Sequence, residues 1–141
     1  DVITLSHSFE HVPDPRETLL SIRRLLRKGG RVVIRMPVMG SYAWRTYGTS
    51  WVQIDAPRHL FLPTAGAFER MASDEGLSVD RVRFDSTEFQ FWGSELVVRG
   101  EPHAQGPGSF SPDEVEEWRR KSQRLNRLND GDQAMFVLSV R

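Results

Sequence analysis

Two short apolar runs flank one amphipathic segment in the N-terminal part of the chain. Residues 2–5 (VITL) and 31–36 (RVVIRM) are rich in β-branched side chains, as buried strands are. The segment between them begins at Asp14-Pro15, a typical helix N-terminus, and ends at Gly29-Gly30. Its apolar residues recur at helical spacing. This order predicts a βαβ unit with parallel strands and a right-handed crossover.

Capping patterns mark the helix starts. Asp14 with Glu17 and Ser111 with Glu114 match the capping box, in which the cap side chain and the third helical residue bond reciprocally. The second of these boxes predicts a charged helix over residues 112–128.

The later strands follow from apolar patterning. Thr64 can cap a helix that leads into a strand at residues 77–84, where a shift in alternation at Asp80-Arg81 predicts a bulge. Residues 134–140 predict a final strand that is apolar enough to be buried on both faces. Residues 37–63 form a long Gly-, Trp- and Pro-rich segment, which is usually functional or carries short helices.

Composition excludes several classes of protein. Without cysteine, the chain has no disulfide scaffold, thiolate nucleophile or zinc–thiolate site. Lys+Arg and Asp+Glu both number 19, so the balanced charge indicates neither a nucleic-acid groove nor an anionic membrane surface. The apolar runs are far shorter than a membrane span, and the N-terminus lacks a signal-peptide pattern. We therefore expect a cytoplasmic protein that binds neither nucleic acid nor membrane.

Three stretches resemble the class I S-adenosylmethionine-dependent methyltransferases. Residues 6–15 (SHSFEHVPDP) and, after the Leu-rich helix, residues 28–37 (KGGRVVIRMP) resemble the region that follows the family's fourth strand. Residues 55–61 (DAPRHLF), before a capped helix, are similar to the broad small-molecule group. The ubiquinone-type O-methyltransferases are also similar. The resemblance covers residues 1–85 and the last strand at 134–141.

The resemblance implies an α/β, Rossmann-like methyltransferase half-domain. Its strands correspond to strands four to seven of the family sheet, in the spatial order 4-5-7-6, and the last strand is antiparallel. We expect one partial domain over residues 1–141, with an acceptor-side loop at 37–63 and an insert at 86–130 that contains the helix 112–128. The family's Gly-rich cofactor loop has no counterpart in this sequence, so we expect a truncated chain that is inactive alone. Its exposed first strand favours a homo-oligomer.

The resemblance also implies the cofactor and its site. S-adenosylmethionine would bind beside Leu5, Ser6 and His7, where the first strand ends, since ligands bind at the carboxyl ends of strands in such sheets. In the ubiquinone-type enzymes this motif carries carboxylates and a histidine that bind a divalent metal. Glu10 and His11 match that pattern, but His7 stands where a Glu is expected. A set of His7, Glu10 and His11 could still hold a metal, but we predict none; Glu10 and His11 are the ligands if one binds. In the alternative, Glu10 pairs with an arginine and His11 packs beneath the loop.

Candidate catalytic residues are three histidines, because a near-neutral imidazole can remove a proton from an oxygen acceptor during methyl transfer. They are His7, His11 and His59. A small-molecule acceptor would lie against four residues of the long loop and its end: Trp44, Trp51, Arg58 and His59.

Two other functions remain open from the sequence. The chain could be a non-catalytic Rossmann-like fragment or interaction module that self-associates through its first strand. It could also belong to another class of Rossmann-like nucleotide enzyme, although an antiparallel final pair of strands would argue against a dehydrogenase.

Overall fold

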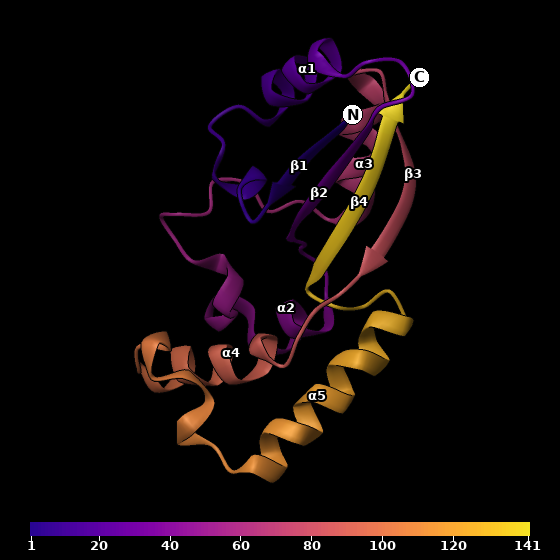
Figure 1. Ribbon diagram of the computed structural model, residues 1–141. Coiled ribbons are helices and arrows are strands. Elements are labelled where there is room, and N and C mark those ends of the chain that lie inside the picture. Colours follow the sequence, from indigo (N-terminus) through magenta and orange to yellow (C-terminus); the bar gives the residue numbers. More distant parts are fainter.

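A four-stranded mixed sheet forms the centre of the computed structural model (Figure 1). The structure describes the backbone of residues 1–141 and the side chains of all residues except 103–105. The strands are β1 (Val2–Ser6), β2 (Arg31–Pro37), β3 (Leu77–Phe84) and β4 (Gln133–Val140). Their spatial order is β1-β2-β4-β3, which confirms the order 4-5-7-6 expected for the last four family strands.

Strand directions also agree with the expectation. β1 and β2 are parallel, with Val2 opposite Arg31, and β4 is antiparallel to both β2 and β3. The register of β3 against β4 shifts between Val79 and Arg81, where the sequence predicted a bulge. Because β1, β2 and β3 run the same way, their carboxyl ends meet at one edge of the sheet, together with the start of β4.

The main core lies between one face of the sheet and two helices, α1 (Pro15–Leu25) and α3 (Ala65–Asp74). Asp14 and Thr64 cap these helices by accepting hydrogen bonds from backbone N–H groups, as predicted. Alternate residues of β2 and β4 are fully buried against the helices, as expected for one covered face. These residues are Val32, Ile34, Met36, Ala134, Phe136 and Leu138.

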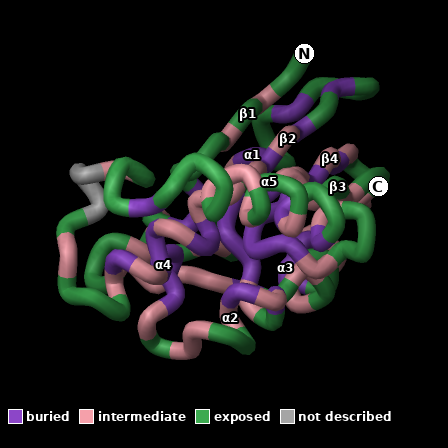
Figure 2. The backbone as a smooth tube through the Cα atoms, turned by 90° about the horizontal axis from the view of Figure 1, so that it is seen from below, coloured by how far each residue is buried: buried purple, intermediate pink, exposed green. Residues whose placement is uncertain are grey.

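The opposite face of the sheet is only half-buried, so the prediction that β4 is buried on both faces is wrong. Met135 and Val137 are intermediate in exposure, whereas their neighbours in the strand are buried. The apolar composition of β4 does not reveal which helices cover the second face. Figure 2 shows buried residues concentrated in the centre of the molecule, whereas the residues of β1 alternate between exposed and intermediate.

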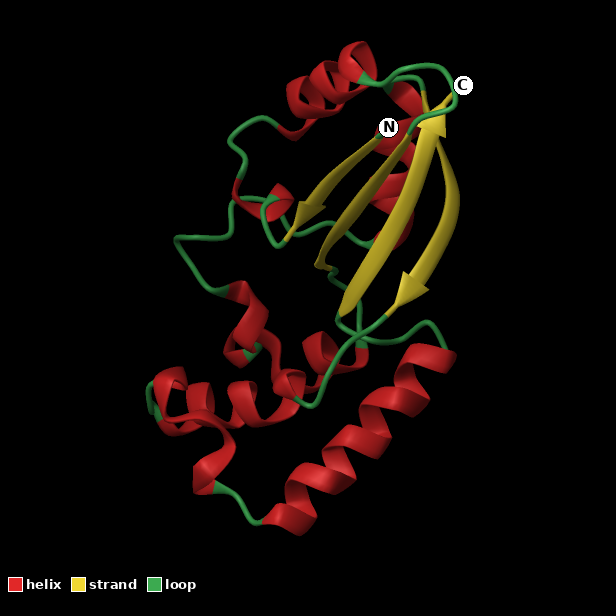
Figure 3. Cartoon of the chain, viewed as in Figure 1, coloured by secondary structure: helices red, strands yellow, loops and turns green.

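A helical lobe lies beyond the carboxyl ends of β1, β2 and β3 (Figure 3). It contains α2 (Tyr42–Tyr47), α4 (Phe89–Arg99) and α5 (Pro112–Arg127), and the short 3-10 helices η2 (Gly48–Ser50), η3 (Val52–Ile54) and η4 (His103–Ser109). A further 3-10 helix, η1 (Phe9–His11), follows β1. The lobe has its own small core around Ala43, Trp51 and Val52. No helix in the described part of the chain is both long and apolar enough to cross a bilayer.

Candidate active site

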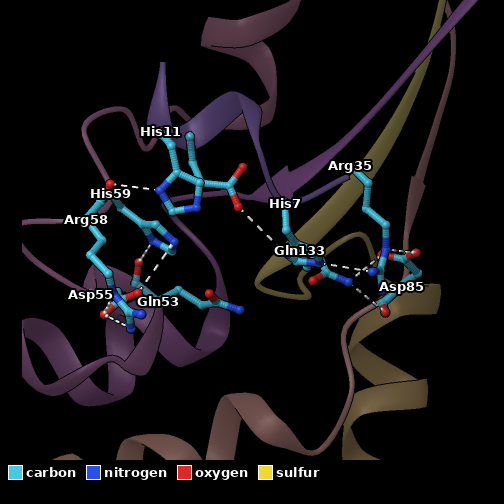
Figure 4. Close-up of polar contacts among 10 residues, drawn as sticks. His7, His11, Arg35, Gln53, Asp55, Arg58, His59, Asp85 and Gln133 are labelled. Carbon is cyan, nitrogen blue, oxygen red and sulfur yellow. Dashed lines mark hydrogen bonds and ion pairs between the residues drawn. The ribbon is translucent and has the colours of Figure 1, made fainter. Parts of the chain in front are cut away.

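A line of polar side chains crosses the sheet edge where the carboxyl ends of β1, β2 and β3 meet (Figure 4). His7 follows β1, Arg35 lies in β2, Asp85 follows β3 and Gln133 begins β4. The Arg35 Nε–H donates to Asp85 Oδ2 at 2.7 Å, and the Gln133 amide donates to Asp85 Oδ1 at 2.8 Å. Each strand, or the residue next to it, contributes one of these side chains. The strand order of the sheet therefore brings them together, and no single sequence motif contains them.

His7 connects this line of side chains to Glu10. Its backbone has φ 49°, which is uncommon for a residue with a side chain, and its N–H donates to the Arg35 carbonyl at 2.9 Å. An Arg35 Nη1 lies 3.0 Å from His7 Nε2. Because a guanidinium can only donate, this contact is favourable when Nε2 is unprotonated and Nδ1 carries the hydrogen. Nδ1 then faces Glu10 Oε1 at 3.4 Å.

Glu10 is a fully buried carboxylate at the centre of η1. Neither of its oxygens has a hydrogen-bond partner among the described residues, and the His7 contact is an ion-pair distance without hydrogen-bond geometry. Burial alone would raise the pKa of Glu10, but His7, the Glu10 backbone and the charge of His59 together lower it. No arginine pairs with it among the described side chains, contrary to one of our expectations.

His11 and His59 form a second cluster beside Glu10. Their rings lie 4.9 Å apart, and each Nδ1 contacts a backbone carbonyl: His11 that of Arg58 at 2.8 Å, and His59 that of Gln53 at 2.6 Å. The Glu10 carbonyl accepts from the N–H groups of residues 60 and 61, so the loop that carries His59 is bound directly to η1. One nitrogen of each imidazole and one Glu10 oxygen all lie within 4.8 Å of one another.

The remaining predicted site residues lie at different depths. Leu5 is half-buried, and Ser6 is exposed at the end of β1. Trp44 is half-buried and packs edge-on against Trp51, with ring centroids 5.9 Å apart. Trp51 is 1% exposed. Arg58 is exposed and forms a two-pronged contact with Asp55.

Trp51 belongs to a buried polar contact that the sequence did not reveal. Its indole N–H donates to Asp132 Oδ2 at 3.0 Å, and Asp132 is buried. Burial raises the pKa of Asp132 to about 6, although the bonds from Trp51 and Ser86 oppose that rise. Trp51 thus links Trp44, against which it packs, to the turn before β4.

Sequence reasoning also missed Arg35, Asp85 and Gln133. The only available signal was position, because each lies at the end or the start of a predicted strand. Arg35 and Asp85 are 50 residues apart in the sequence, so the pairing appears only once the strand order is known.

These features define a Rossmann-like α/β protein, a class in which ligands bind at the carboxyl ends of the parallel strands. Residues 1–82 match the sequence profile of a family described as a methyltransferase domain. The chain therefore belongs to that methyltransferase family, whose members use S-adenosylmethionine. No curated protein sequence matches the chain.

Solved structures share the fold at low sequence identity. A Haloferax volcanii complex of the Trm112 methyltransferase activator with a methyltransferase matches at 17% identity and a TM-score of 0.56, covering 99% of this chain and 54% of that one. A mycolic acid cyclopropane synthase with bound S-adenosylhomocysteine matches at 17% identity and a TM-score of 0.54, covering 98% and 54%. A Brevibacillus brevis O-methyltransferase in complex with S-adenosyl-L-homocysteine matches at 14% and 0.51, covering 99% and 43%. The chain spans about half the length of these structures.

Proposed function

We propose that this chain forms the acceptor side of an S-adenosylmethionine-dependent methyltransferase that acts on a small molecule. Family membership supports methyl transfer. The observation that supports the site is the contact of Arg35, His7 and Glu10 at the carboxyl ends of β1 and β2. Ligands bind at this edge in open α/β sheets, and here it presents an imidazole backed by a buried carboxylate.

The residues at the end of β1 fit one side of the cofactor. Ser6 and His7 are exposed there, and the outer edge of β1 pairs with no other strand among the described residues. No described strand leads through a Gly-x-Gly turn into a helix. The side of the cofactor that faces away from Ser6 and His7 would therefore need binding groups other than the described residues. Leu5, Ser6 and His7 would contact the methionine part. When bound, S-adenosylmethionine supplies an activated methyl group on a sulfonium.

His7 is our candidate for the proton acceptor. An acceptor hydroxyl that displaces the Arg35 guanidinium from His7 Nε2 could give its proton to that nitrogen. The Nδ1–H of the resulting imidazolium would face the Glu10 carboxylate, which stabilises the charged ring as carboxylates do behind catalytic histidines. Arg35 would stay near, since Asp85 holds its Nε.

The acceptor itself would lie between this line and the loop at residues 37–63. Arg58 is exposed and could bind an anionic group, and Trp44 presents a half-buried indole that packs against Trp51. His11 and His59 lie at the same side of η1 and complete the set of imidazoles near the acceptor. The helical lobe would cover the acceptor, because it stands beyond the same strand ends.

Replacing His7 tests the proposed role. In the full-length protein, we expect His7→Ala to lower methyl transfer by about 100-fold, as loss of a general base does. The assay incubates the protein with methyl-labelled S-adenosylmethionine and a metabolite extract, then counts label in the small-molecule fraction. Arg83→Ala, which removes an exposed cation from β3, is the matched control and should stay within about twofold.

The assay distinguishes failure of the proposed role of His7 from failure of the proposed methyltransferase function. Wild-type transfer that is unchanged in His7→Ala would remove His7 from the mechanism and leave the methyltransferase standing. A wild-type protein that labels no small molecule would count against the proposed function itself.

We also propose that the exposed edge of β1 pairs two copies of the chain, which light scattering would detect as a dimer mass.

A further inference from the structure

The Glu10 carboxylate has one oxygen, Oε2, that the proposed role of His7 does not use. Its side chain is fully buried, and neither oxygen has a hydrogen-bond partner among the described residues. Buried ionised carboxylates are normally paired, hydrogen-bonded or bound to a metal. His7 approaches only Oε1, at 3.4 Å. The second oxygen is left for a different partner.

Two imidazoles beside Glu10 are oriented as metal ligands usually are. The carbonyls of Arg58 and Gln53 can only accept, so Nδ1 of His11 and Nδ1 of His59 each carry the hydrogen. Both rings in their neutral form therefore have a lone pair at Nε2, and Nε2 of His59 also lies 3.8 Å from Asp55 Oδ2. A metal-binding histidine typically donates its other N–H to a carbonyl or carboxylate, which sets its tautomer and ring orientation.

The three side chains lie close enough to share one ion. One ligand atom from each of Glu10, His11 and His59 lies within 4.8 Å of the other two. Ligands of a tetrahedral zinc ion, at about 2.0–2.1 Å from the metal, are about 3.3 Å apart. A bound ion would thus have to draw these atoms together by about 1.5 Å or less. The bonds between the Glu10 carbonyl and residues 60 and 61 keep the two segments together.

We infer that Glu10, His11 and His59 bind a divalent transition-metal ion of the Zn²⁺ class. Two imidazole nitrogens and one carboxylate oxygen suit zinc, whereas Mg²⁺ and Ca²⁺ prefer oxygen ligands alone. Three protein ligands leave a fourth position open for water or another small ligand. The family resemblance suggested position 7 as the third ligand, but the structure places His59 there and leaves His7 with Arg35. The inference concerns metal binding and does not rest on methyl transfer.

Metal binding to the full-length protein tests this site. We would add Co²⁺ to protein stripped with a chelator, record its visible d–d absorption, and then displace it with Zn²⁺ in a calorimeter. We expect one ion per chain, with the intense absorption of a low-symmetry, four-coordinate site. His59→Ala and His11→Ala should each weaken Zn²⁺ binding by more than the roughly 10–100-fold that loss of a supporting residue causes.

His7→Ala is the discriminating control, because it should keep both the Co²⁺ spectrum and the Zn²⁺ affinity within a few-fold. His11 is exposed, so His11→Ala is expected to fold and keeps the test valid if a Glu10 or His59 variant does not. Equal loss in His7→Ala and His59→Ala would overturn the ligand set. Failure of wild-type protein to bind Co²⁺ or Zn²⁺, or binding of Mg²⁺ in preference, would overturn the site.

Discussion

Phe9→Ala is expected to lower the free energy of unfolding by about 3–5 kcal/mol, as truncation of a fully buried phenylalanine does. Phe9 is 0% exposed and packs edge-on against Phe61 and Phe68, with ring centroids 6.0 and 5.5 Å away. Its loss removes apolar contacts and leaves a cavity that neighbouring rings fill only in part. Urea denaturation followed by circular dichroism would measure the change.

The substitution should also loosen the candidate site, because Phe9 anchors η1 between His7 and Glu10. Phe9→Leu retains most of the volume and should cost about 1–2 kcal/mol. Leu25→Ala is the matched surface control, since Leu25 is 74% exposed and should cost about 0.5 kcal/mol or less. Equal effects of Phe9→Ala and Leu25→Ala would show that Phe9 is not in the core.

Asp132→Asn is expected to remove a pH-dependent loss of stability. The pKa of Asp132 is about 6 in the folded protein, against 3.8 for the ordinary side chain, because burial disfavours the charged form. Between these values the folded state holds a proton that the unfolded state has released, so stability falls as pH rises. The loss should be on the order of 3 kcal/mol, at about 1.4 kcal/mol for each pKa unit.

Denaturation curves at several pH values from 4 to 7.5 would measure this effect as the difference between variant and wild type. An asparagine side-chain oxygen can still accept from the Trp51 indole, so the buried contact is retained while the charge is removed. Relative to wild type, Asp132→Asn should gain stability as pH rises. Asp113→Asn, at an exposed position in α5, should show no such trend. A flat difference for Asp132→Asn would contradict the buried, pKa-raised carboxylate.

Local patterns predicted most of the secondary structure. Ser111 and Glu114 form both bonds of the capping box at the start of α5. At α1 only half of the expected box is present: Asp14 accepts from the Glu17 N–H, but the Glu17 side chain contacts Ser21 and Arg24 on the helix surface. The backbone bond of a cap follows directly from the residues at the helix start. The exposed Glu17 side chain, in contrast, has several possible partners on the helix surface, and the capping pattern does not decide among them.

The candidate site was predicted only in part. His7, Glu10 and His11 follow a strand within one motif, so their sequence positions alone placed them at the sheet edge. The contact of His11 with Arg58 spans 47 residues, and the Arg35 contact with Asp85 spans 50. Such contacts depend on strand order and on the docking of the loop onto η1, which no local pattern encodes.

We propose that a methyl-transfer cofactor binds at the carboxyl ends of β1 and β2. The most direct test is titration of the ¹⁵N-labelled full-length protein with S-adenosylhomocysteine, followed by amide NMR. We predict saturable shifts at Leu5, Ser6 and His7 and in the residues that follow β2, with little change at Gly29-Gly30 at the opposite end of the sheet. Shifts confined to that opposite end, or no saturable binding, would contradict the claim.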